Sequence, residues 1–211
     1  MLLKLTINSL YARLLTVSMT IFAISLSLML YLSVEKLRSS AYTSFTNTIS
    51  QTDLIVGSRT GSVQLLLYSI FRIGNATNNI TWESYQDIIE KDEVEWAVPI
   101  SLGDSHKGYR VMGTNKDFFK HYKYRGNKSL VIKDGKYFSD LYDVVLGFGV
   151  AEKLDYQINS SIIVSHGLKS FTDHDDQPFK VSGILAKTGT PVDNTIIVSL
   201  KAIEAIHVDW S

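Results

Sequence analysis

The longest apolar stretch of the chain is an uncharged run near its N-terminus, from Leu14 to Val34. As a helix with a rise of about 1.5 Å per residue, this run matches the roughly 30 Å hydrocarbon core of a bilayer. Lys4 and Arg13 precede it, as they would in a cleaved signal sequence, but such signals carry only about 7–15 apolar residues. Residues 14–34 are therefore predicted to form an uncleaved transmembrane helix.

Basic residues are nearly balanced on the two sides of this run, so the positive-inside rule separates the two orientations only slightly. We expect residues 1–13 to lie in the cytoplasm and the bulk of the chain to lie on the opposite side of the membrane.

The helical pattern continues beyond the predicted span, because apolar residues recur at steps of three and four through residue 49. This periodicity predicts that the helix leaves the membrane and extends as a stalk over residues 35–50. A continuous rod that joins membrane and domain can transmit motion. The stalk residues expected to carry this coupling are Glu35, Leu37, Arg38, Tyr42 and Phe45.

The remainder of the chain alternates short apolar runs with short helical patterns, which predicts a mixed α+β domain over residues 51–211, of one or two lobes. The polar, turn-rich region 126–135 is the candidate boundary between lobes. A helix is expected at 81–91, with Thr81 as its N-cap and Ser84 at the third position. The other predicted helices are 63–71 (a helix or turn), 115–122, 150–154 and 200–206, and the predicted strands are 53–57, 94–102, 109–113, 143–146, 161–165, 179–185 and 195–199.

Composition removes several classes of function. Lys and Arg together number 21, as do Asp and Glu, so the chain has no net charge that would attract nucleic acid. The chain contains no cysteine, which excludes thiolate catalysis, disulfides, iron–sulfur clusters and cysteine zinc sites. No phosphate-binding loop of the form Gly-x-x-x-x-Gly-Lys-Ser/Thr is present either.

Six short motifs follow the apolar span and stalk in a fixed order. With the span and stalk they resemble the N-terminal half of MacB/FtsX-type ABC transporter permeases, which comprises the first transmembrane helix and a periplasmic core domain. Such permeases carry three further transmembrane helices, so we expect this chain to be a fragment of a longer permease. The motifs are Thr52–Gly57, Gln64–Leu67, Gly113–Thr114, Val144–Gly147, Val181–Leu185 and Thr188–Asp193.

The resemblance implies a non-enzymatic transporter subunit in the bacterial inner membrane, with its main domain in the periplasm. It implies a cytoplasmic ABC ATPase as partner, whose ATP-driven dimerisation is relayed through the stalk to the periplasmic domain. Membrane lipid, a periplasmic partner protein or substrate, and a second permease in a homodimer or pair are the other implied partners. The implied function is mechanotransmission, export, or the handling of substrates or lipoproteins.

Histidine and carboxylate residues gather late in the chain. His166 follows one predicted strand, His174 and Asp176 precede the next, and His207 ends the last predicted helix. Nitrogen and oxygen ligands suit Zn²⁺ without cysteine, so these four residues are a candidate metal site if the flanking strands pair. The alternative is a solvated polar loop with unrelated histidines. The loop 166–176 is also the expected extracytoplasmic contact site.

Two other functions compete with a permease. A serine hydrolase would need Ser105 and His106, or Ser165 and His166, to act as nucleophile and base, but neighbours in a strand point to opposite faces. A single-pass periplasmic sensor or adaptor that binds a ligand or metal would need no ATPase. Only thirteen residues precede the span, which leaves such a sensor little inside the cell to report to.

Overall fold

The structure is a computed structural model that describes residues 11–75, 78–166 and 178–207. Within these ranges, the side chains of residues 44–46 and 166 fall outside the description. The chain divides into two compact units, Met1–Phe45 and Thr46–Ser211, and each is described by itself.

The first unit consists of the helix α2 (Leu14–Thr48), whose last turn enters the second unit. Its stretch Leu14–Thr43 is long and apolar enough to cross a membrane, and none of it is buried in the protein. Ser18 and Thr20 bond their hydroxyls to the carbonyls of Leu15 and Thr16, so these polar groups are satisfied inside the apolar stretch. The predicted helix that continues from the span into the stalk is confirmed.

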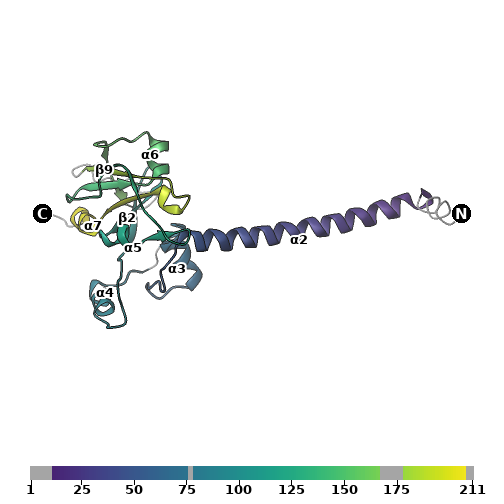
Figure 1. Cartoon of the computed structure of the whole chain (residues 1–211), viewed down its shortest axis with the longest axis horizontal. Coiled ribbons are helices and arrows are strands. Elements are labelled where there is room, and N and C mark those ends of the chain that lie inside the picture. Colours follow the sequence, from purple (N-terminus) through teal and green to yellow (C-terminus); the bar gives the residue numbers. More distant parts are fainter. Residues whose placement is uncertain (1–10, 76–77, 167–177, 208–211) are drawn as a thin grey trace. The chain divides into compact units, whose positions relative to one another are not determined.

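The second unit is built on a mixed eight-stranded sheet of the described residues, in the order β5-β9-β6-β10-β2-β1-β8, with β7 paired to β9 (Figure 1). The central strand β10 runs parallel to β2 and antiparallel to β6. The strands are β1 (Ser101–His106), β2 (Tyr109–Thr114), β5 (Ile132–Gly135), β6 (Asp143–Leu146), β7 (Ser161–Ile162), β8 (Ser165–His166), β9 (Phe179–Leu185) and β10 (Thr195–Ser199).

The segment Ser161–His166 closes the sheet on itself. Its first two residues pair with β9, and its last two pair with β1, four strands away in the sheet order. The strands β9, β6, β10, β2 and β1 therefore form a circuit with this segment. Ile162 and Val164, which lie along it, are fully buried.

Two hydrophobic clusters cover the two faces of the sheet, and β2 contributes alternate residues to them. Val111 faces the cluster shared with α6 (Phe148–Leu154) and α7 (Leu200–His207). Met112 faces the cluster shared with α5 (Asp117–His121). A Cβ on Gly113 would lie 2.6 Å from Ile203 of α7, so this glycine allows the helix to pack directly on the sheet.

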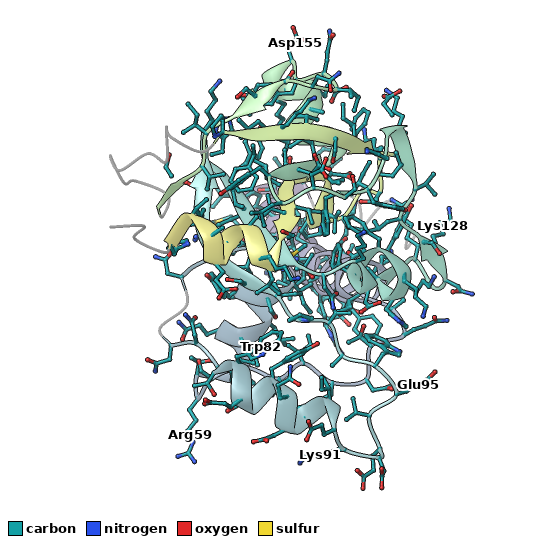
Figure 2. The ribbon with its side chains drawn as sticks, turned by 90° about the vertical axis from the view of Figure 1, so that its left-hand side faces the viewer. Arg59, Trp82, Lys91, Glu95, Lys128 and Asp155 are labelled. Carbon is teal, nitrogen blue, oxygen red and sulfur yellow. The ribbon has the colours of Figure 1, made fainter. Side chains whose placement is uncertain are left out.

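Residues 53–100 contain two helices without buried residues, α3 (Ser62–Ser69) and α4 (Trp82–Ile89). Thr81 caps α4 as predicted, because its hydroxyl accepts the N–H of Ser84 at 3.2 Å. Figure 2 shows Lys91 and Glu95 at the periphery of the unit. Side-chain burial thus contributes little to the stability of these two helices.

Three predicted strands, at 143–146, 179–185 and 195–199, have the bounds observed for β6, β9 and β10. The predicted strand at 53–57 is wrong. Its backbone is in no strand, and Leu54 is 75% exposed, because no neighbouring strand offers a hydrogen-bonding edge. The strand predicted at 94–102 begins only at Ser101 and continues to His106, and that predicted at 161–165 is split into β7 and β8.

The polar region 126–135 is not a boundary between lobes, since residues 46–211 form one compact unit. It contributes β4 (Lys128–Ser129), which pairs with β3 (Lys123–Tyr124), and the sheet strand β5. Sequence patterning missed these strands because they are short and largely exposed, so they lack the alternation that marks a half-buried strand.

Candidate functional site

The end of α2 meets the β3–β4 hairpin in a set of hydrogen bonds that we call the junction, formed by residues 47–50 and 122–126. The backbone N–H of Arg125 donates to the carbonyl of Asn47 at 2.9 Å, and that of Ser50 donates to the carbonyl of Lys123 at 2.9 Å. The N–H of Gly126 donates to Ser50 Oγ at 3.2 Å. Positive φ angles at Arg125 and Gly126 form the tight turn, and the N–H groups of both turn residues are used in these contacts.

Tyr122 completes the junction. Its phenol donates to the carbonyl of Thr48 at 2.5 Å and lies 3.4 Å from Thr190 Oγ1. Its ring packs against Phe118, with centroids 5.1 Å apart. Burial raises the pKa of the Tyr122 phenol, so the phenol is protonated at neutral pH and acts as a donor. Tyr122 therefore links the last turn of α2 to the segment that precedes β10.

That segment, residues 188–193, is a turn organised around one buried carboxylate. Asp193 Oδ1 accepts the N–H and the hydroxyl of Thr188, both at 2.8 Å, and Oδ2 accepts the N–H of Gly189 at 2.7 Å. The hydroxyls of Thr188 and Thr190 are 2.8 Å apart. Gly189 has a φ of 73°, which explains a glycine at this position. The segment is thus a tight connection before the strand that begins at Thr195.

The turn continues through a short 3-10 helix, η1 (Pro191–Asn194), directly into β10. The N-terminal end of α6 packs tightly against η1, because a Cβ on Gly147 would overlap the carbonyl oxygen of Val192 and lie 2.6 Å from that of Asp193. A chain of hydrogen bonds thus runs from the last turn of α2 through Tyr122 and the 188–193 turn to the central strand of the sheet.

The predicted stalk residues lie on α2 within the first unit. Arg38 Nη1 lies 3.7 Å from Glu35 Oε2 in an exposed pair one turn apart, an interaction of the kind that contributes little to stability. Leu37 and Tyr42 are 70% and 71% exposed. The side chain of Phe45 lies outside the described part. The coupling role of these five residues stays a prediction.

The candidate metal ligands are only partly within the description. His174 and Asp176 lie outside the described residues, as does the side chain of His166. The predicted strand 161–165 pairs with its expected neighbour β9 only through β7, whereas β8, which contains His166, pairs with β1. His207 Nε2 instead lies 3.6 Å from Asp104 Oδ1, on the strand that pairs with β8.

No group of three possible metal ligands occurs among the residues that the structure describes. Zinc binding by His166, His174, Asp176 and His207 therefore stays a prediction. A calorimetric titration of the full chain with Zn²⁺ tests it, with His207→Gln as the variant, and the absence of heat at micromolar metal would refute it.

The geometry of His106 does not support the hydrolase alternative. Its Nε2 lies 2.8 Å from the phenol of Tyr156, and its Nδ1 lies 2.5 Å from the carbonyl of Ile163. Both ring nitrogens therefore have hydrogen-bond partners that are not serine hydroxyls, in a buried setting that orients the ring.

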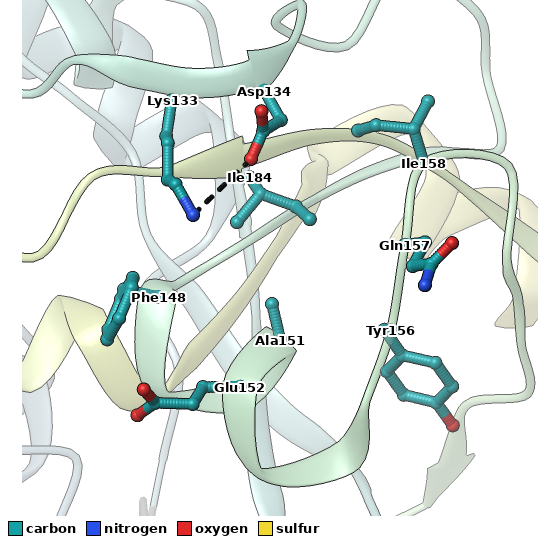
Figure 3. Close-up of a pocket in the computed structure, with 9 residues that line it drawn as sticks. All are labelled: Lys133, Asp134, Phe148, Ala151, Glu152, Tyr156, Gln157, Ile158 and Ile184. Atoms are coloured by element: carbon teal, nitrogen blue, oxygen red, sulfur yellow. Dashed lines mark ion pairs between the residues drawn. The ribbon is translucent and has the colours of Figure 1, made fainter.

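A surface cavity of about 530 Å³ lies between β5, β9 and α6 (Figure 3). Phe148 lies at one end, with Lys133 Nζ 5.8 Å and Lys187 Nζ 5.6 Å from its ring centroid. Lys133 also pairs with Asp134 at 3.7 Å, and Glu152 adds a second acid. Because charges of both signs surround an apolar floor, the cavity selects no single class of ligand.

The junction itself was missed at the level of sequence. Tyr122 stands in the sequence as one of eleven tyrosines, and Ser50 and Arg125 carry no motif. The one available signal was the glycine at 126 in a polar turn, which was interpreted as a boundary. The contacts are made mainly by backbone groups, which a sequence pattern does not reveal.

Comparison with known proteins identifies the family. Residues 14–210 match the model of the MacB-like periplasmic core domain. No curated protein sequence matches the chain. A solved domain described as part of a permease from Porphyromonas gingivalis is similar at 11% identity and a TM-score of 0.37, over 54% of this chain and 55% of that one. The chain thus spans about half of that domain, and no argument rests on so partial a likeness.

The family match covers both the apolar helix and the whole described second unit, as the sequence resemblance predicted. The mixed sheet with its covering helices agrees with the α+β class expected for the soluble part. The chain belongs to the family of MacB-like periplasmic core domains.

Proposed function

We propose that the chain is the coupling part of an ABC permease subunit in the bacterial inner membrane. In this proposal a separate cytoplasmic ATPase supplies the energy, α2 is displaced, and the periplasmic core changes its conformation to move a substrate or a partner protein. The family match and the apolar N-terminal helix support the setting. Membrane lipid around α2 and a second permease in the same complex belong to the proposal as well.

The observation that carries the proposal is the junction. Two hydrogen bonds between backbone groups and one from Tyr122 hold residues 47–50 against the β3 strand and its turn. At about 1 kcal/mol each, these three bonds sum to roughly 3 kcal/mol, several times the thermal energy. A displacement of the last turn of α2 would therefore carry the hairpin with it rather than break the contact.

From the hairpin, the route to the sheet is short. Tyr122 contacts Thr190, which belongs to the turn that leads into β10. Shifts of about 1–2 Å at helix interfaces are sufficient to repack bistable elements in other proteins. Because β10 lies between β6 and β2, a shift of its first residues would change the pairing at the centre of the sheet.

The test is a Tyr122→Phe variant of the full permease, assembled with its ATPase in liposomes. This change removes the hydroxyl that bonds to Thr48 and keeps the ring that packs on Phe118. The control is Tyr137→Phe, whose hydroxyl bonds to the nearby carbonyl of Leu130 at 3.4 Å and takes no part in the junction. We expect ATP hydrolysis to continue in both variants and transport per ATP to fall only in Tyr122→Phe. Equal transport in both would contradict the proposal.

A further inference from the structure

Residues 62–75, which we call the cover segment, meet the strand β2 at two arginines. Arg110 belongs to β2, and Arg72 belongs to the cover segment itself, with its Nη2 atom 2.9 Å from Met112 Sδ. Residues 110 and 112 lie on the same face of β2, about 7 Å apart along the strand. The Tyr68 ring lies 5.7 Å from Arg110 Cζ, and the field of its phenol raises the pKa of the Arg72 guanidinium.

The two guanidinium groups are incompletely paired. The Nε and Nη1 atoms of Arg72 and the Nε atom of Arg110 are buried without a hydrogen-bond partner among the described residues. Within the same part of the chain, no carboxylate lies at ion-pair distance from either arginine. Arg110 Nη2 donates to the carbonyl of Gly74 and to Asn75 Oδ1, the latter at 2.8 Å. Three buried donor atoms therefore remain for a group that the described residues do not supply.

The charge on Arg72 persists in this setting. Burial lowers the pKa of its guanidinium to about 10, opposed by the fields of the Tyr122 and Tyr68 phenols, so the group is still protonated at neutral pH. A buried charge without a partner is costly, as is a buried donor without an acceptor. The site thus holds uncompensated positive charge.

The backbone at Arg72 adds a second unfavourable feature. Its φ is 62°, in the left-handed region that a residue with a side chain adopts at a cost of about 1–2 kcal/mol. With this backbone conformation, the guanidinium of Arg72 reaches Met112 on β2. Strained backbone and unpaired buried charge at one residue are typical of binding sites.

The cover segment is held in its middle by Tyr68 and Ile70, and at its 74–75 end by Arg110. Ile70 is buried, and the Tyr68 hydroxyl donates to the carbonyl of Leu102. Ile73 is 59% exposed, and Gly74 and Asn75 are exposed as well. A ligand that enters at the 73–75 end would therefore replace Gly74 and Asn75 as acceptors for Arg110.

We propose that Arg72 and Arg110 bind a phosphate group that enters beneath the 73–75 end of the cover segment. Guanidinium groups bind carboxylate and phosphate oxygens with strong, directional hydrogen bonds. The three unpaired nitrogen atoms of the two side chains match in number the three acceptor oxygens of a phosphate group better than the two oxygens of a carboxylate. The phosphate is either free or part of a lipid headgroup. This site does not depend on movement through α2.

The experiment is an isothermal titration of the full chain in detergent micelles with inorganic phosphate, at constant ionic strength. We expect saturable binding to the unaltered chain and, for Arg72→Met, binding that is weaker by about ten-fold or more. Arg72→Lys keeps the charge but loses the planar fork, and we expect it to bind weakly as well. Arg59→Met is the matched control, because Arg59 is an exposed arginine that points away from the unit (Figure 2), and its binding should not change.

Thermal unfolding in phosphate-free buffer separates a binding role from a structural one. Because Arg72→Met removes an uncompensated buried charge, we expect its midpoint to equal or exceed that of the unaltered chain. Arg110→Met provides a second variant with weakened binding. A titration with dihexanoyl phosphatidic acid, compared with glycerol 3-phosphate, distinguishes the sources: tighter binding of the lipid indicates a headgroup, and equal binding indicates free phosphate. No saturable binding to the unaltered chain, or equal binding by Arg72→Met, would overturn the proposal.

Discussion

The buried carboxylate of Asp193 offers the sharpest test of the route from the junction to the sheet. It accepts three hydrogen bonds, two from Thr188 and one from Gly189, at 2.7–2.8 Å. Hydrogen bonds to a charged acceptor contribute about 1.5–3 kcal/mol each, and they are not additive within one network. Asp193→Ala leaves all three donors without their acceptor, so we expect a loss of about 3–5 kcal/mol in the free energy of unfolding.

The variant Asp193→Asn distinguishes the hydrogen bonds to Thr188 from the one to Gly189. An amide oxygen can still accept from Thr188, but the amide nitrogen faces the N–H of Gly189, donor against donor. The expected loss is therefore smaller, about 2 kcal/mol. Glu204→Gln is the control, because Glu204 is an exposed acid on α7, and its free energy of unfolding should change by less than about 0.5 kcal/mol.

Urea unfolding of the full chain in detergent, followed by tryptophan fluorescence, measures these differences. The three tryptophans all lie in residues 46–211, so the signal reports on the second unit rather than on α2. In a domain of this size, 3–5 kcal/mol corresponds to a fall of roughly 10 °C in the melting temperature. Equal losses for the Ala and Asn variants, or a loss below about 1 kcal/mol for both, would refute the role assigned to the carboxylate.

Three further predictions follow from other parts of the chain. Leu37→Asp or Phe45→Asp should uncouple ATP hydrolysis from transport in the full complex, and normal coupling would count against the stalk. Gly147→Ala should destabilise the second unit strongly in a thermal melt, because the added Cβ meets the backbone of η1, whereas Gly103→Ala, with open space around its Cβ, should have little effect. Burial raises the pKa of the Asp143 carboxyl, but hydrogen bonds from the preceding turn outweigh burial and lower this pKa below 3.8. The carboxylate therefore stabilises the fold above pH 3.8, and this stabilisation is lost as the pH falls further. Asp143→Asn should reduce the loss of stability at acid pH in a series of unfolding measurements, and an unchanged loss would contradict this prediction.

Patterns of hydrophobic residues predicted the strands with the most buried neighbours. The runs at 143–146, 179–185 and 195–199 are apolar on both sides because their strands lie inside the sheet with both faces covered, and their bounds were correct. The run at 53–57 is equally apolar, yet it is not a strand. An apolar run becomes a strand only where a partner edge exists, and that depends on the fold of the whole domain.

The sequence predicted less of the candidate site than of the fold. Apolar periodicity predicted that the helix α2 continues past its apolar stretch. The contacts that join this helix to the β3–β4 hairpin depend on backbone groups at Asn47 and Arg125, and any residue provides a carbonyl and most provide an N–H. The unpaired nitrogens of Arg72 were equally invisible, because a lone arginine in a loop carries no pattern.

The central claim is that displacement of α2 reaches the sheet through the junction. Hydrogen exchange of the full permease with its ATPase, measured by mass spectrometry with and without ATP, tests it most directly. We predict that ATP changes the exchange of the amides of Ser50, Arg125 and residues 188–195, while α4, which has no buried residues and no part in the route, stays unchanged. Changes confined to α2, with the junction and the 188–195 segment unaffected, would contradict the account.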